Sequence, residues 1–193
     1  DIIVPRGGKS LVAKIQKEAK VPVFAHLEGI CHVYVDHEVN LDKSIKIIIN
    51  SKMRRTGICG AAETLLIDKK LEKDSILKII SQLQEANCEI RGDKSLKNIV
   101  GNVTLANEED WSTEYLDAII SVKLVDGVEQ AVSHINKYSS QHTETIITEN
   151  EENASYFLTN VDSAIVMKNA STQFADGGEF GMGAEIGIST GRL

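Results

Sequence analysis

Hydrophobic and polar positions follow two rhythms along this chain. Short runs rich in Val, Ile and Thr are typical of buried β-strands. They occur at residues 1–4, 31–36, 63–68, 102–106, 119–125, 145–148 and 163–168. We therefore expect a strand at each of these places.

Between these runs, apolar residues recur with the spacing of amphipathic helices. The two clearest apolar stripes consist of Leu41, Ile45, Ile48 and Ile49, and of Val128, Ala131, Val132 and Ile135. Further helices are expected at about residues 9–19, 74–86 and 151–161. Alternation of strands and helices predicts an α/β fold whose mostly parallel sheet is flanked by helices.

Composition narrows the class of protein. The chain has 193 residues, a formal net charge of −7 and an aromatic content of only 5%. It contains no apolar run of about 18 residues and no secretory leader, so we expect a cytoplasmic protein with no membrane partner. An acidic chain with few aromatic residues also argues against a nucleic-acid partner. The odd number of cysteines, Cys31, Cys59 and Cys88, predicts free thiols rather than a disulfide framework.

Two cofactor motifs and a metal motif fail on inspection. The segment Gly7–Ser10 resembles the end of a phosphate-binding P-loop but has Ile3 where the first glycine belongs, and no complete G-x-G-x-x-G fingerprint occurs. His26, Cys31 and His32 have the residue types of a zinc site. A strand over 31–36 would point Cys31 and His32 to opposite faces, so we favour packing roles and expect no metal ion.

Cys59 lies in a more suggestive setting, R-R-T-G-I-C-G, between a predicted helix and a predicted strand. Its flanking glycines let a ligand approach the backbone, and the two arginines would favour a thiolate if they lay nearby. A small buried cysteine filling a turn is the competing interpretation, since no histidine neighbours Cys59 in sequence to act as its base. Glycines also cluster in the last 17 residues, which predicts either tight turns or a ligand wall there.

Several segments together carry a family resemblance: G-I-C-H-V-Y-V-D at 29–36, T-G-I-C at 56–59, E-T-L-L at 63–66, D-W-S-T-E-Y-L-D at 110–117, and N-A-S-T at 169–172 through G-I-S-T at 187–190. The chain resembles gamma-glutamyl phosphate reductase (glutamate-5-semialdehyde dehydrogenase), a member of the aldehyde dehydrogenase superfamily. The similar region is the later, catalytic portion of that enzyme. We therefore expect residues 1–193 to form the thiol-bearing catalytic domain, with the dinucleotide-binding half absent.

The resemblance implies a function. The family reduces gamma-glutamyl phosphate with NADPH to glutamate 5-semialdehyde in proline biosynthesis and releases phosphate. By resemblance Cys59 is the nucleophile that forms a thioester, and Glu114 contacts the cofactor's ribose. Asn169, Ser171 and Thr172 match the substrate-side loop. A homodimer and a separately encoded cofactor-binding half are the protein partners that the resemblance suggests.

The chain departs from the family pattern at three places. Gly60 replaces the usual asparagine after the nucleophile, the proline near Thr56 is absent, and Gln173 replaces an arginine. An amide cannot reproduce the bidentate grip of a guanidinium on an anion, so we expect weaker substrate binding. These departures keep an alternative open, a catalytically inactive remnant or subunit-interaction module that retains the fold.

Overall fold

The computed structural model describes residues 1–185 and 187–191. It contains six α-helices, seven strands and two short 3-10 helices within that part of the chain. In chain order these are α1 (Lys9–Glu18), β1 (Cys31–Val35), α2 (Leu41–Met53), β2 (Ala62–Asp68), α3 (Lys73–Glu85), β3 (Glu89–Gly92), α4 (Lys94–Val100), β4 (Thr104–Leu105), η1 (Glu109–Ser112), β5 (Ile119–Val125), α5 (Gly127–Tyr138), β6 (Thr143–Ile147), α6 (Glu151–Asn160), β7 (Ile165–Lys168) and η2 (Thr172–Phe174).

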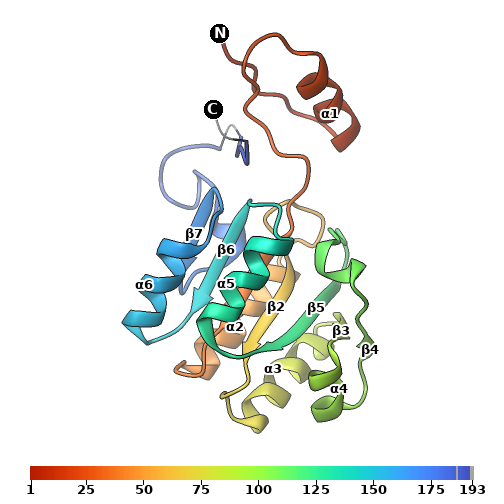
Figure 1. Cartoon of the computed structure of the whole chain (residues 1–193), viewed down its shortest axis with the longest axis vertical. Helices are drawn as coiled ribbons and strands as arrows, with labels where there is room; N and C mark the ends of the chain where they lie inside the picture. The colour runs from red at the N-terminus through yellow and green to blue at the C-terminus, as the bar shows by residue number, and fades with distance from the viewer. Residues whose placement is uncertain (186, 192–193) are drawn as a thin grey trace.

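The strands form one parallel sheet in the order β4-β3-β5-β2-β1-β6-β7. Helices cover both of its faces (Figure 1). The central strands β1 and β2 are buried along their whole length, which explains why their sequences read as nearly continuous apolar runs. The prediction of an α/β fold with a parallel sheet is confirmed.

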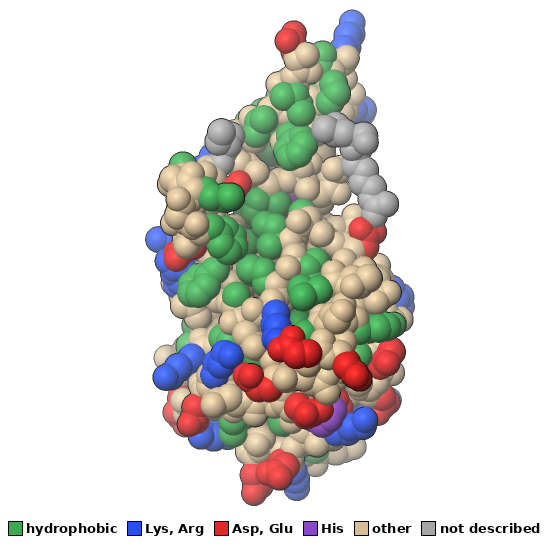
Figure 2. Space-filling model, turned by 90° about the vertical axis from the view of Figure 1, so that its left-hand side faces the viewer, with side chains coloured by type: hydrophobic (Ala, Val, Ile, Leu, Met, Phe, Trp, Pro, Cys, Tyr) green, Lys and Arg blue, Asp and Glu red, His purple; other side chains and the backbone are tan. Residues whose placement is uncertain are grey.

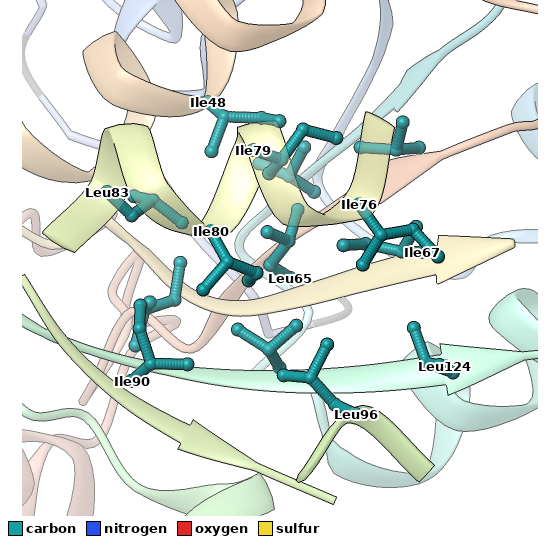
Figure 3. Close-up of a cluster of buried hydrophobic side chains, with 14 of the residues drawn as sticks. Ile48, Leu65, Ile67, Ile76, Ile79, Ile80, Leu83, Ile90, Leu96 and Leu124 are labelled. Atoms are coloured by element: carbon teal, nitrogen blue, oxygen red, sulfur yellow. The ribbon is translucent and has the colours of Figure 1, made fainter. Parts of the chain in front are cut away.

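Side chains of the central strands β1 and β2 alternate between two hydrophobic cores. Val33, Val35, Leu65 and Ile67 pack with α2, α3 and α4 on one face, where Figure 3 shows several of the buried side chains. The intervening residues of the same strands pack with α5 and α6 on the other face. Tight packing on both sides gives the sheet the rigidity needed to hold a site at the ends of its central strands.

Two predictions of secondary structure need correction. The expected strand at 1–4 is only an isolated bridge between Ile3 and Val23, because this segment lies outside the sheet and has no strand ladder to join. The sequence analysis also missed β3 and α4. Each is short, and β3 (E-I-R-G) contains a single large apolar residue, Ile90, which is too little for a recognisable period.

Residues 1–30 and the last described residues lie together beyond one end of the sheet (Figure 1). Hydrogen bonds join these two segments: the Thr190 amide and the Ser189 hydroxyl donate to the Ala25 carbonyl oxygen. No helix in the described part of the chain has the length and apolar character needed to cross a membrane.

Candidate active site around Cys59

Cys59 lies in the turn that connects α2 to β2. The turn is closed by a hydrogen bond of 2.9 Å from the Ala61 amide to the Ile58 carbonyl oxygen. The Cys59 side chain is half-buried and lines a cavity of about 330 Å³, whereas Cys31 and Cys88 are buried. Arg6, Phe24 and Ile188 are among the other residues that line this cavity. Residues near the start of the chain and residues of the glycine-rich segment near its end thus both line the cavity beside Cys59.

The other two thiols are poor nucleophiles. Burial raises the pKa of Cys31 well above that of a free thiol, and it raises the pKa of Cys88 to about 12. Cys31 instead donates from its sulfur to the Cys59 carbonyl oxygen at 3.1 Å. Cys59 is therefore the thiol that a small molecule can reach.

The backbone of Gly29 packs directly against the Cys59 carbonyl group. A β-carbon at position 29 would lie 1.9 Å from the Cys59 carbonyl oxygen, so only glycine fits there. The Gly29 amide donates to Oε1 of Glu114 at 2.7 Å. The structure therefore brings Glu114, from the loop after η1, close to the Cys59 turn through a single intervening residue.

Two histidines that sequence spacing does not connect with Cys59 lie beside it. The metal-binding atoms of His26, Cys59 and His142 are all within 4.8 Å of one another. The rings of His26 and His142 meet edge to face with centroids 4.5 Å apart. His26 precedes β1 and His142 precedes β6, and these strands are neighbours in the sheet. The pairing of β1 with both β2 and β6 places His142 beside Cys59, and the loop before β1 supplies His26, so neither histidine is a sequence neighbour of the thiol.

The expected substrate-side residues divide into two groups. Asn169 has a positive φ of 53°. Its side-chain oxygen accepts from the Thr148 amide at 3.1 Å, and its side-chain nitrogen donates to the Thr148 carbonyl oxygen at 2.9 Å. The Ser171 hydroxyl caps η2 by accepting from the Gln173 amide. Both groups are occupied within the chain. The Thr172 hydroxyl is buried without a partner among the described residues, and it alone of the three is uncommitted.

The segment 171–173 packs against the Cys59 turn. A β-carbon at Gly60 would lie 3.3 Å from the Thr172 carbonyl oxygen, which is a tight contact. Gln173 is buried, and its amide nitrogen donates to the Ser51 and Arg55 carbonyl oxygens at 2.9 and 3.1 Å. In this chain Gln173 therefore braces the end of α2 beside the turn.

The arginines before Cys59 do not share one role. Arg54 forms an ion pair of 2.6 Å with Glu179 and lies over the Phe174 ring. Arg55 is exposed. The ion pair links α2 to the glycine-rich segment, and Gly187 and Ile188 of that segment line the Cys59 cavity. Part of the tail thus lines the cavity, and whether a ligand binds against it stays a prediction.

A buried ion pair lies on the β2 side of the turn. Lys52 Nζ and Glu63 Oε2 are 2.5 Å apart, and both side chains are inaccessible to solvent. Burial raises the pKa of Glu63 to about 7, and the Lys52 ammonium opposes that rise. The Leu116 amide also donates to Glu63 at 3.4 Å, which links this pair to the loop that carries Glu114.

Cys31 and His32, which the sequence analysis assigned to packing rather than to a zinc site, have structural partners. His32 contacts Glu144 at 3.1 Å inside the sheet, while Cys31 faces His142 at 3.7 Å. A second group of potential metal ligands, Asp36, His37 and Asp68, lies where β1 and β2 end. Its carboxylates already accept hydrogen bonds from Thr148, Asn153 and the Lys70 amide.

No model of a protein family matches the chain. Its sequence is 60% identical over 193 residues to gamma-glutamyl phosphate reductase of Parvibaculum lavamentivorans and 59% identical to that of Brucella suis. Each of these matches covers 100% of this chain and 46% of the relative. The crystal structure of gamma-glutamyl phosphate reductase from Thermotoga maritima superposes with a TM-score of 0.96 at 46% identity, over 100% of this chain and 46% of that chain. An acetylating aldehyde dehydrogenase from Geobacillus thermoglucosidasius superposes with a TM-score of 0.73 at 20% identity, over 99% of this chain and 51% of that chain.

The fold is thus that of an aldehyde-dehydrogenase-like domain, with a half-buried thiol in the turn before a central strand. Within that class, the whole chain matches gamma-glutamyl phosphate reductases in sequence and in structure. The chain spans about half the length of the curated relatives that it matches.

Proposed function

We propose that this chain supplies the nucleophile for the NADPH-dependent reduction of gamma-glutamyl 5-phosphate to glutamate 5-semialdehyde and phosphate, a cytoplasmic step of proline biosynthesis. One observation carries the proposal. Cys59 alone of the three cysteines opens onto a cavity, in a chain 60% identical to gamma-glutamyl phosphate reductase.

In the proposed reaction the Cys59 sulfur attacks the acyl carbon. The bond from that carbon to the phosphate oxygen breaks, phosphate leaves, and a thioester forms on Cys59. Backbone N–H groups of the turn would stabilise the oxyanion of the tetrahedral intermediate. The tight contact between Gly29 and the Cys59 carbonyl keeps this turn in place while the acyl group is exchanged.

The cofactor, when bound, supplies the hydride that reduces the thioester. Glu114 suits the role of a ribose ligand because a carboxylate accepts hydrogen bonds from hydroxyl groups, and Gly29 holds it near Cys59. Most of the remaining contacts to a dinucleotide would come from the other half of a full-length reductase.

For the substrate, the proposal rests on Thr172 more than on its neighbours. Its hydroxyl has no partner among the described residues but is fully buried, so binding of a glutamyl or phosphate oxygen there would need this loop to open, while Asn169 and Ser171 would shape the loop. The expected loss of anion affinity at Gln173 stays a prediction. Gln173→Arg tests it through the protection that phosphate gives Cys59 against alkylation.

Acyl transfer to Cys59 can be tested without the cofactor. We expect acetyl phosphate, a small acyl phosphate, to acylate the chain once after EDTA has removed any metal ion bound to the thiol. Mass spectrometry should locate the acyl group at Cys59, and hydroxylamine, which cleaves thioesters, should remove it. Iodoacetamide should modify Cys59 at least about ten-fold faster than Cys88. Cys88→Ser is the matched control, and Cys59→Ser should lose the adduct. A chain that takes no acyl group and alkylates Cys59 as slowly as Cys88 would contradict the proposal.

That contrary result would favour the second candidate, an inactive subunit-interaction module. The observation on its side is the concentration of exposed apolar residues in the segment before β1, among them Ile2, Leu11, Phe24 and Leu27. Figure 2 shows apolar side chains gathered over the upper half of one face, above a lower half rich in charged groups. Such an apolar surface fits contact with a further half of the enzyme or with a second copy.

A further inference from the structure

Three side chains with the chemistry of zinc ligands converge where the Cys59 cavity meets the sheet. The ligand atoms of His26, Cys59 and His142 all lie within 4.8 Å of one another. In a tetrahedral zinc site, Zn–N bonds of about 2.0–2.1 Å and a Zn–S bond of about 2.3 Å place the ligand atoms roughly 3.3–3.6 Å apart. Side-chain rotations that bring the ligand atoms about 1 Å closer together would therefore close this arrangement around an ion.

The His26 imidazole already makes the kind of contact that metal ligands usually make. His26 contacts the Ile188 carbonyl oxygen through Nδ1 at 2.8 Å, which leaves Nε2 with its lone pair. Histidines that ligate zinc commonly donate their other ring nitrogen to a backbone carbonyl in this way. The Nδ1 atom of His142 lies 2.9 Å from the Thr143 hydroxyl.

The Nε2 atom of His142 gives an independent indication. It is fully buried and has no hydrogen-bond partner among the described residues. A buried nitrogen without a partner costs free energy, and coordination to a metal ion would remove that cost. Nothing in the proposed acyl transfer uses this atom.

The cavity decides what kind of metal site this would be. Cys59 and His26 line it, so three protein ligands would leave the fourth position facing an open space of about 330 Å³. A thiolate with two neutral imidazoles favours Zn²⁺ over Mg²⁺ or Ca²⁺, which prefer oxygen ligands. The Cys31 sulfur is not a fourth ligand in this arrangement, because it donates to the Cys59 carbonyl oxygen.

From this geometry we infer that His26, Cys59 and His142 form a binding site for Zn²⁺. On binding, a bond forms between the Cys59 sulfur and zinc, and the thiol proton leaves to solvent. Because the ion takes the sulfur's lone pair, zinc blocks alkylation or acylation of Cys59 until it is removed. Metal binding rests on the geometry alone, and its inhibitory effect on the reductase rests on the proposed function.

Cobalt provides a direct probe, since Co²⁺ replaces Zn²⁺ and a cobalt–thiolate bond gives a near-ultraviolet charge-transfer band. We expect the EDTA-treated chain of 193 residues to bind one Co²⁺ with such a band, and one Zn²⁺ to displace it. Cys59→Ser should abolish the band. His26→Gln should weaken binding at least about ten-fold, the lower limit for losing even an outer partner of a metal ligand.

Matched controls separate this site from others. Cys88→Ser and His37→Gln should leave the band unchanged, the latter because His37 belongs to the group with Asp36 and Asp68. His26 is half-buried on a loop, so His26→Gln is expected to fold even if a substitution at the buried His142 does not. Thermal melting of each variant checks this.

Absence of a thiolate band, its survival in Cys59→Ser, or unchanged affinity in His26→Gln would overturn the zinc site. Loss of metal binding in His37→Gln instead would assign the metal to the other cluster and also overturn it. The outcome is independent of the acylation test. A cobalt band in a chain that takes no acyl group and alkylates Cys59 as slowly as Cys88 leaves the metal site standing and contradicts only the reductase proposal.

Discussion

At the scale of single residues, the Cys59 site depends on one position without a side chain. Gly29 lets two loops touch where any β-carbon would overlap the Cys59 carbonyl oxygen. The same residue holds Glu114 through its amide. Gly29 therefore couples the orientation of the thiol to that of the proposed cofactor ligand.

Gly29→Ala is predicted to displace the Cys59 turn while leaving the sheet folded. We expect the selective alkylation of Cys59 over Cys88 to fall to near equality, measured by mass spectrometry of tryptic peptides. Gly8→Ala is the matched control, since a β-carbon there meets nothing within 4 Å. Undiminished selectivity in Gly29→Ala would show that the close contact does not position the thiol.

The buried pair of Lys52 and Glu63 gives a second prediction at this scale. Lys52→Met leaves the Glu63 carboxyl buried without its cation, and should lower the free energy of unfolding by about 3–5 kcal/mol at neutral pH. The double variant Lys52→Met/Glu63→Gln should recover part of that loss. Urea denaturation of the single and double variants measures both, and additive losses would contradict the coupling.

The raised pKa of Glu63 also makes stability depend on pH. The carboxyl binds its proton more tightly in the folded chain (pKa about 7) than in the unfolded chain (4.5), so it favours folding fully below about pH 4.5. That contribution is lost as the pH rises towards 7. The wild-type chain should therefore lose stability relative to Glu63→Gln over this interval, and a constant difference would contradict the assignment.

The residues of the site also show where sequence reasoning stops. Cys59 could be singled out because its glycines and its place between a helix and a strand are local features. His142 could not, because its proximity to Cys59 arises from the placement of β2 and β6 on either side of β1. For the same reason the side-chain bonds that occupy Asn169 and Ser171 were not visible in the sequence.

At the scale of elements, side-chain caps define where several helices begin. Asn40, Asp93 and Asn150 each accept a hydrogen bond from an amide in the first turn of α2, α4 and α6. The five long helices were predicted from their apolar period and all are present, and the three that were given ranges, α1, α3 and α6, end within one residue of them. The seven-residue α4 has too few turns to display such a period, so its cap contributes a larger share of its stability.

Asp93→Ala is therefore predicted to lower the free energy of unfolding by about 1 kcal/mol, because the Leu96 amide loses its acceptor at 2.8 Å. Thermal or urea denaturation measures the change. Lys94→Ala, one residue along the same helix, should have an effect within about 0.5 kcal/mol. Equal losses in the two variants would show that the cap does not stabilise α4.

At the scale of the whole molecule, a two-faced sheet is joined to a thinner outer lobe. The central strands are fully buried, whereas most residues of 1–25 are exposed and Val12 is the one buried residue of α1. Figure 1 shows α1 standing clear of the sheet. Few buried contacts predict a low free energy of local opening for this lobe.

Hydrogen exchange should reveal that difference. Amides of β1 and β2 are expected to exchange slowest, and those of α1 to exchange close to the rate of an open chain. Mass spectrometry of peptides from 1–25 and from 31–68 makes the comparison. Equal protection of the two regions would contradict the division into a rigid sheet and a loosely held lobe.

The contacts that close the cavity wall join distant parts of the sequence. His26 and the Ile188 carbonyl oxygen are 162 positions apart, and Ala25 and Ser189 are 164 apart. These contacts hold a segment with few buried residues, so they gain little stability until the sheet and its two cores have formed. A newly synthesised chain would thus pass through a stage with a finished sheet and an unwalled sulfur. Formation of the cavity around the Cys59 sulfur is then a step separate from folding of the sheet.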